Sequence, residues 1–193
     1  FGLAPIPRVK DTTLVEYEHA KVDIWHWQDD YLQPMQLVNL KRDLSRNYTA
    51  MINLASNRNV IPLSDETFNR ISLTGDADNE WAMATSDKEY RIETQWEGGM
   101  RSDIYAISTL TGKNKLVTKS NSGYASLSPN GDYIVYFNRS NGNWYSFNIA
   151  SETSKQLNEG LPVSFVDEEN DVPAAPGPYG IAGWSKDGKN IYI

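Results

Sequence analysis

The apolar positions of the chain fall into short runs separated by Asn, Asp, Gly and Ser, and this spacing predicts strands joined by turns. Residues 104–107, 133–137 and 144–149 are rich in β-branched and aromatic side chains and are too short for helices, as expected of half-buried strands. The pairs Asn130-Gly131 and Asp187-Gly188 tolerate the positive φ that two-residue hairpin turns need. The pattern therefore predicts an antiparallel meander.

Helices have little support in the same pattern. A helix needs apolar residues at i, i+3, i+4 and i+7 over about ten or more positions. The best candidates are residues 15–20 and 65–71, and neither is long enough to predict a helix. We therefore expect an all-β chain.

A short motif repeats along the chain. Residues 126–134 return as residues 182–191, and the two share the skeleton Ser-x-(Asn/Asp)-Gly-x-x-Ile. Residues 84–92 are interpreted as a degenerate third copy, in which Tyr90 aligns with Tyr133. The intervals between copies are close to the length of a propeller blade, about 40–50 residues.

A second piece recurs after the first. Residues 104–113 and 144–153 each combine a strand with a polar turn, and residues 50–57 are interpreted as an earlier relative. Together the two motifs form units of four antiparallel strands, whereas a β-sandwich would show no such repetition. The sequence therefore predicts a partial β-propeller of roughly four blades. Its blade-like repeats are expected at residues 37–80, 81–120, 121–160 and, incomplete, 179–193.

Composition and charge exclude several classes of function. The chain has 18 Lys+Arg against 25 Asp+Glu, a net charge of −7, and no basic stripe, so we expect no nucleic-acid partner. Hydrophobic residues make up 39% of it, enough for a folded core, but no apolar run is long enough for a membrane span. Without cysteine there is no disulfide, thiolate nucleophile or Cys-based metal site.

Two longer stretches carry a family resemblance. They are residues 22–29 with 32–36 (Val-Asp-Ile-Trp-His-Trp-Gln-Asp and Leu-Gln-Pro-Met-Gln) and residues 167–173 leading to 178–184. With the Ser-x-Asx-Gly repeat, they resemble the propeller of the prolyl oligopeptidase and dipeptidyl peptidase IV family of serine peptidases, in its long Bacteroides-type forms. The resemblance covers nearly the whole chain. It implies a propeller that precedes a C-terminal α/β-hydrolase domain, in a periplasmic or secreted protein.

The catalytic part of that family has no counterpart in this sequence. There is no Gly-x-Ser-x-Gly elbow, and the only histidines, His19 and His26, precede every blade motif. We therefore expect a non-catalytic piece, with no cofactor or metal, that gates or positions peptide substrates for the α/β-hydrolase domain of the parent chain. Because residues 190–193 stop within an expected strand, such a piece is expected to self-associate through unpaired edges.

Two alternative functions remain open at this point. The first is a protein- or glycan-binding propeller module with no peptidase attached. The second is a propeller glycosidase that works with a pair of carboxylates.

The densest acidic cluster comprises Asp167, Glu168, Glu169 and Asp171. The resemblance implies that the Glu168-Glu169 pair binds the free amino terminus of a peptide, because the family uses a Glu-Glu pair of its propeller in this way. Paired carboxylates suit an ammonium group chemically. A solvated acidic loop is the competing interpretation, since charge runs are usually exposed.

Three further groups of residues are weighed against plain structural roles. Residues 76–80 alternate carboxylates as a calcium loop does, but they lack the Gly and the closing Glu, which favours a polar turn. His26 lies in a strand-like run near Asp23 and Asp29 but has no second ligand at metal-binding spacing. The six tryptophans are interpreted as core between blades, with a sugar-stacking platform as the alternative. They are Trp25, Trp27, Trp81, Trp96, Trp144 and Trp184.

Overall fold

The computed structural model describes residues 2–4, 6, 9, 12–13, 15–19, 22–55, 59–97 and 99–193. The helices are α1 (Gln33–Leu44) and α2 (Arg91–Glu97), and Glu16–Glu18 and Lys88–Tyr90 form 3₁₀ turns. The strands are β1 (Gly2–Leu3), β2 (Tyr48–Ile52), β3 (Val60–Pro62), β4 (Arg70–Ser72), β5 (Trp81–Ser86), β6 (Ser102–Ser108), β7 (Asn114–Asn121), β8 (Ala125–Leu127), β9 (Tyr133–Asn138), β10 (Asn143–Asn148), β11 (Thr153–Gln156), β12 (Gly183–Trp184) and β13 (Ile191–Tyr192).

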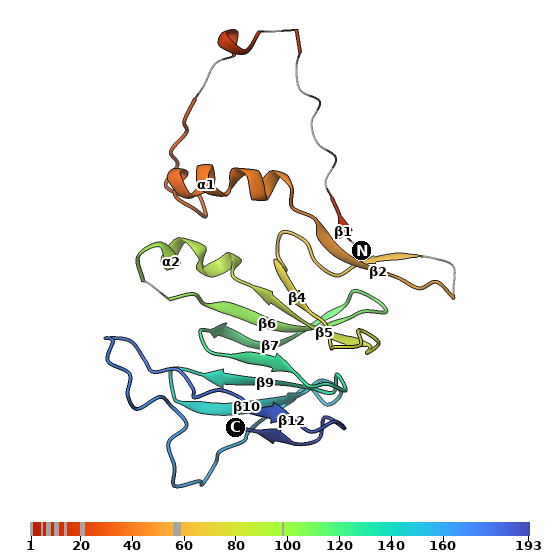
Figure 1. The fold of residues 1–193 in the computed structure, drawn as a ribbon, viewed down its shortest axis with the longest axis vertical. Coiled ribbons are helices and arrows are strands. Elements are labelled where there is room, and N and C mark those ends of the chain that lie inside the picture. The colour runs from red at the N-terminus through yellow and green to blue at the C-terminus, as the bar shows by residue number, and fades with distance from the viewer. Residues whose placement is uncertain are drawn as a thin grey trace.

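The strands form four antiparallel sheets that follow one another along the long axis of the molecule (Figure 1). Their strand orders are β1-β2-β3, β4-β5-β6-β7, β11-β10-β9-β8 and β12-β13. The prediction of an all-β chain is confirmed in this coarse form, and the sheets of the described residues do not close into a ring. The second sheet begins at Arg70, so the predicted repeat boundary at residue 81 falls between two strands of one sheet.

The third sheet buries both of its faces. Side chains alternate along β9, so Ile134 and Tyr136 join a cluster shared with the second sheet, whereas Val135 and Phe137 join a cluster on the opposite face. This two-sided burial explains why residues 133–137 are apolar without interruption. The first cluster consists of Met83, Ile104, Ala106, Ile134, Tyr136, Phe147 and Ile149, and the second of Val135, Phe137 and Trp144 with Phe165, Ile181, Trp184 and Ile191 packed against them.

The two predicted hairpin turns have the same hydrogen bonds. The serine hydroxyl of each turn, in Ser128 or Ser185, accepts the N–H of the residue five positions later, at 2.9 Å in both. The serine carbonyl accepts the N–H of the turn glycine, Gly131 or Gly188, also at 2.9 Å. Both glycines have a positive φ, of 73° and 67°. The repetition of this motif is therefore confirmed.

These turns stack on one another through a glycine and an asparagine. A Cβ on Gly188 would lie 2.7 Å from Cγ of Asn130, and a Cβ on Gly131 would lie 2.9 Å from Cβ of Asn79. The Nδ2 of Asn79 also donates a hydrogen bond to the carbonyl of Pro129, at 2.9 Å. Because Asn79 lies in the loop between β4 and β5, this loop is the third member of the stack.

The third copy that the sequence predicts at residues 84–92 is therefore wrong. β5 ends at Ser86, and a 3₁₀ turn and the start of α2 follow it. The second recurring piece is confirmed, because residues 104–113 and 144–153 contain the third strand of each four-stranded sheet and the turn after it. Its proposed relative at 50–57 overlaps β2, and residues 56 and 57 lie outside the described residues.

The helices α1 and α2 are exceptions within this mostly β structure, and neither coincides with the two weak helix candidates of the sequence. Pro34 stands in the first turn of α1, where a missing N–H costs no hydrogen bond, and basic residues lie in the last turn, where they offset the helix dipole. Leu37, Leu40 and Leu44 are spaced as on one helical face, but no residue of α1 is buried and these three side chains are half exposed or more. In the part of the chain that the structure describes, neither helix is long and apolar enough to cross a bilayer.

The two weak helix candidates have other structures. Asp65 forms a turn, because its carboxylate accepts the N–H groups of Thr67 and Phe68 at 2.7 and 2.8 Å. Within residues 15–20, Glu16–Glu18 make one 3₁₀ turn, and Ala20 lies outside the described residues.

The stacked turns predict a measurable difference between two glycine substitutions. Gly160 has a φ of 74° and open space around it, whereas Gly131 has nearly the same φ and packs on Asn79. We expect Gly160→Ala to cost the left-handed penalty of roughly 1–2 kcal/mol. Gly131→Ala costs this penalty and, in addition, the displacement of Asn79. The free energies of unfolding in urea measure both losses.

A double-mutant cycle tests whether Asn79 is responsible. If Gly131 and Asn79 are in contact, Gly131→Ala costs less in an Asn79→Gly background, which removes the Cβ of Asn79, with a coupling free energy above about 0.5 kcal/mol. Equal losses for Gly131→Ala and Gly160→Ala would contradict the stacking of the turns.

Candidate functional site

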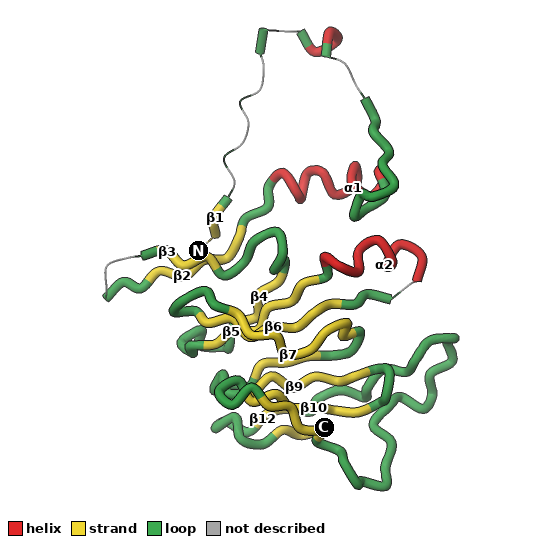
Figure 2. Tube along the Cα trace, turned by 180° about the vertical axis from the view of Figure 1, so that it is seen from behind, coloured by secondary structure: helices red, strands yellow, loops and turns green. Residues whose placement is uncertain are grey.

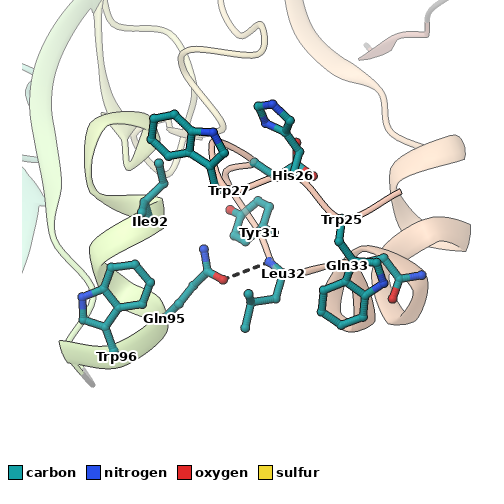
Figure 3. Close-up of a pocket in the computed structure, with 10 residues that line it drawn as sticks. Trp25, His26, Trp27, Tyr31, Leu32, Gln33, Ile92, Gln95 and Trp96 are labelled. Carbon is teal, nitrogen blue, oxygen red and sulfur yellow. Dashed lines mark hydrogen bonds between the residues drawn. The ribbon is translucent and has the colours of Figure 1, made fainter. Parts of the chain in front are cut away.

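A pocket of about 240 Å³ lies between residues 25–33 and helix α2. Figure 2 shows α1 and α2 on the same side of the molecule, as Figure 1 does from the front. Trp25, Trp27 and Trp96 line the pocket and remain 65%, 83% and 70% exposed. In Figure 3, Ile92, Gln95 and Trp96 come from α2, and Tyr31 and Leu32 lie between them and Trp25. We call this site the aromatic pocket.

Helix α2 fixes the wall of the aromatic pocket. Gln95 accepts the N–H of Leu32 with Oε1 at 2.9 Å and donates its Nε2 to the carbonyl of Asp30 at 2.8 Å. One turn earlier, Arg91 pairs with Asp30 at 2.9 Å and with Asp87 at 2.8 Å, and its side chain is only 12% exposed. Two side chains of one helix therefore hold the segment that carries the tryptophans.

The guanidinium of Arg91 also lies 5.5 Å from the centre of the Tyr31 ring, as a cation over an aromatic face. Burial raises the pKa of Tyr31, and the nearby Asp87 carboxylate adds to this increase. Tyr31 is therefore a neutral phenol near pH 7, and its ring already has a cation beside it.

The aromatic pocket contains both hydrogen-bond donors and hydrogen-bond acceptors. Nδ1 of His26 accepts the N–H of Gln28 at 3.2 Å, so this ring has its proton on Nε2. Asp29 accepts one hydrogen bond, from Gln36 at 3.2 Å, and Gln33 donates its amide N–H to Asp23 at 2.9 Å. His26 immediately precedes a turn, in which its carbonyl accepts the N–H of Asp29 at 3.2 Å, and it does not lie in the strand that the sequence suggests. Over the described ranges, no three acidic or histidine side chains converge in a way that could hold a metal ion.

A second polar cluster surrounds the buried carboxylate of Asp103, which is 3% exposed. Its Oδ1 accepts the hydroxyl of Tyr90 at 2.6 Å and the N–H of Ser120 at 2.9 Å, and its Oδ2 lies 3.4 Å from the hydroxyl of Tyr105. Burial raises the pKa of both tyrosines, and Asp103 raises each further. These bonds satisfy the carboxylate with neutral donors, so the cluster stabilises the junction of β6, β7 and the 3₁₀ turn.

The Glu168-Glu169 pair lies in an exposed loop, away from the aromatic pocket. Tyr179 accepts the N–H of Glu168 at 3.2 Å, and the Asp167 carboxylate accepts the N–H of Glu169 at 3.1 Å. Backbone groups therefore hold the loop, and both glutamate carboxylates face solvent. Their role in binding an amino terminus stays a prediction.

Residues 76–80 belong to the stacked loop between β4 and β5, where Asn79 has a structural role. The six tryptophans divide into two groups. Trp144 is fully buried, Trp184 packs against the same cluster, and Trp81 is half-buried with the ammonium of Lys115 at 4.8 Å from its ring. The other three surround the aromatic pocket.

Sequence reasoning missed the residues that build this site, Arg91 and Gln95. A signal for them exists, because Asp87, Arg91 and Gln95 are spaced four apart, as residues on one helical face are. Asp87 and Arg91 lie within residues 84–92, which the repeat pattern interprets as strand and turn, and so that pattern predicts no helix there.

No protein-family model matches the chain, and a search of curated proteins finds no match. The chemistry of the site therefore has to be inferred from its own side chains.

The anchoring of the aromatic pocket predicts a local effect of Gln95→Leu. This change keeps the size of the side chain and removes both hydrogen bonds, each worth about 1 kcal/mol. We expect the amide of Leu32 to exchange with deuterium about fivefold faster. Thr94→Val is the matched control, because within the described residues the hydroxyl of Thr94 bonds only to the carbonyl of Tyr90, inside the same helical segment. Unchanged exchange at Leu32 in Gln95→Leu would argue against the anchor.

The Asp103 cluster predicts a loss of stability at alkaline pH. The pKa of Tyr90 is raised from 10.0, so the folded state holds this proton more tightly than the unfolded state does. The resulting stabilisation is complete below pH 10 and is lost as the pH rises through the raised pKa. We expect Tyr90→Phe to be less stable at pH 8 by about 1 kcal/mol and to lose less stability than the wild type above about pH 10.

Chemical denaturation between about pH 8 and 11.5 measures this dependence. Tyr192→Phe, at an exposed position of β13, controls for the removal of a phenol. Parallel pH profiles for the wild type and Tyr90→Phe would contradict the assignment.

Proposed function

We propose that this chain is a non-catalytic set of propeller-type blades that positions peptide substrates for a prolyl-oligopeptidase-like serine peptidase. The observation that supports the proposal is the stacking of equivalent hairpins, in which Gly131 and Gly188 each pack on the preceding loop. Consecutive four-stranded meanders related by such contacts are the arrangement expected of neighbouring blades. The family resemblance of residues 22–36 and 167–184 supplies the link to the peptidases.

In this proposal the sheets are a rigid support and the loops make the contacts with substrate. The loop of Glu168 and Glu169 is the candidate for the peptide amino terminus, since its carboxylates are exposed and unpaired within the described residues. An ammonium group between two carboxylates forms charge-assisted hydrogen bonds, which are about twice as strong as neutral ones. Bond cleavage is assigned to an α/β-hydrolase domain, because the sequence has no nucleophile elbow.

The aromatic pocket favours a second candidate function, a ligand-binding module. Three exposed tryptophans around one pocket are more than a structural role requires. This binding function is compatible with the first, because the two loops lie on different parts of the chain.

The proposed function predicts binding of peptides without hydrolysis. Labelled peptides with a free amino terminus should bind in fluorescence anisotropy, and N-acetylation should weaken binding about tenfold or more, because it removes the charge that the glutamates would bind. The double variant Glu168→Gln and Glu169→Gln should lose the same factor. Glu159→Gln, an exposed glutamate outside the loop, is the matched control.

A chromogenic proline-containing dipeptide should be hydrolysed no faster than in buffer. Hydrolysis that a serine-directed inhibitor abolishes would place a catalytic serine in this chain and overturn the non-catalytic assignment. Equal binding of free and N-acetylated peptides would overturn the role of the glutamates.

A further inference from the structure

We propose that the aromatic pocket binds a neutral saccharide, with pyranose rings packed on the exposed indoles of Trp25, Trp27 and Trp96. This inference rests on the second candidate function, whose ligand it names, and does not depend on the positioning of peptides. It begins with the division of the tryptophans, because Trp144 is fully buried at the centre of a cluster whereas these three are 65–83% exposed. Exposed aromatic side chains that gather at one pocket mark an interaction site.

The charges of the aromatic pocket exclude an anionic ligand. Among its lining residues there is no lysine or arginine, and Asp29 adds a carboxylate. An anionic group placed there would meet the carboxylate of Asp29, and the guanidinium of Arg91 beside Tyr31 is already paired with two carboxylates. Acidic sugars, phosphates and acidic peptides are therefore poor ligands for this site.

The arrangement of the rings argues against a small cation. An aromatic cage surrounds an ammonium group with several rings that meet at one point. In the described part of the chain, the only ring contact among the pocket's aromatic side chains joins His26 and Trp27, at 6.2 Å. The face of Tyr31 already carries the guanidinium of Arg91. Figure 3 shows Trp25 and Trp96 on opposite sides of Tyr31 and Leu32, as separate surfaces.

Separate apolar surfaces suit a ligand made of linked rings. The C–H face of a pyranose is apolar and flat enough to pack on an indole, and each tryptophan here can accept one such face. The volume of about 240 Å³ lies just below the ~300–1,000 Å³ of typical small-molecule sites. One sugar ring therefore occupies the pocket, and its neighbours extend over the indoles outside.

The polar atoms of the aromatic pocket match sugar hydroxyls, which both donate and accept hydrogen bonds. The donors are the indole N–H groups and the Nε2–H of His26, none of which has a partner within the described ranges. The acceptors are Oδ1 of Asp29 and Oε1 of Gln33, because the hydrogen bonds of these side chains use their other atoms. A site for a proline-rich peptide would need donors for its carbonyl groups and few acceptors, because proline has no N–H.

The aromatic pocket is also held in place before any ligand arrives. Gln95 and Arg91 fix residues 30–32, so the wall between the tryptophans loses little conformational entropy on binding. Preorganisation of this kind suits the weak individual contacts of a neutral sugar.

Native gel electrophoresis in gels that contain a neutral polysaccharide tests the proposal. We expect a β-glucan, a galactomannan or amylose to retard the chain, and anionic polygalacturonate to leave its mobility unchanged. Calorimetric titration with an oligosaccharide of the retarding polymer should then show binding that Trp27→Ala and Trp96→Ala each weaken by about tenfold or more. Tyr17→Ala, at an aromatic position that is 86% exposed and outside the pocket, should bind as the wild type does.

Because the substituted tryptophans are exposed, the variants should unfold at the same temperature as the wild type, which a melting curve checks. Retardation that survives in a double variant with Trp27→Ala and Trp96→Ala overturns the proposal, as does the absence of retardation in all three neutral gels. Binding of choline in place of sugar would assign the site to a cation instead. A dimer that dissociates on Trp27→Ala would show that a second copy covers the indoles, and this result also overturns the proposal.

Discussion

The fold depends on the burial of β9 on both sides. A strand whose odd and even side chains are all apolar is stable only when something covers each face of its sheet. The second sheet covers one face of the third sheet. Side chains of residues 165–191, which include the hairpin of β12 and β13, cover the other face. The linear succession of sheets follows from this requirement, because the third sheet cannot be an end layer. The turns then fix how neighbouring layers meet, since Gly131 and Gly188 each pack so closely on an asparagine of the preceding loop that a Cβ would not fit.

The strands of the third sheet and both hairpin turns could be predicted from the sequence because their determinants are local. An uninterrupted apolar run at 133–137 and a serine three residues before a glycine are visible without any tertiary information. The loop at 74–79 performs the same stacking role with a different sequence. The sequence pattern therefore places the third copy at residues 84–92, which span the end of β5 and the start of α2. Its role depends on contact with Pro129, which no pattern within the loop encodes.

The candidate site was harder to predict for a related reason. Composition identifies six tryptophans, but burial depends on which segment covers each ring, and this follows from tertiary packing. Trp27 and Trp144 have equally aromatic neighbours in the sequence, yet one is 83% exposed and the other fully buried. Helix α2, which holds the site together, consists of seven residues with no buried side chain. The sequence indicates this helix by the four-residue spacing of three polar residues, Asp87, Arg91 and Gln95, and not by an apolar stripe.

The last hairpin shows what the stacking means for the order in which the chain folds. β12 and β13 have two residues each, and a two-stranded ribbon of that size is at best marginally stable in water. Trp184 and Ile191 gain their apolar contacts only from the finished third sheet, and Gly188 needs Asn130 already in its turn. The hairpin of β12 and β13 therefore depends on contacts with residues that are synthesised before it. Because each four-stranded layer is a meander of sequence neighbours, its loops close over short distances, and synthesis and folding can advance in the same direction.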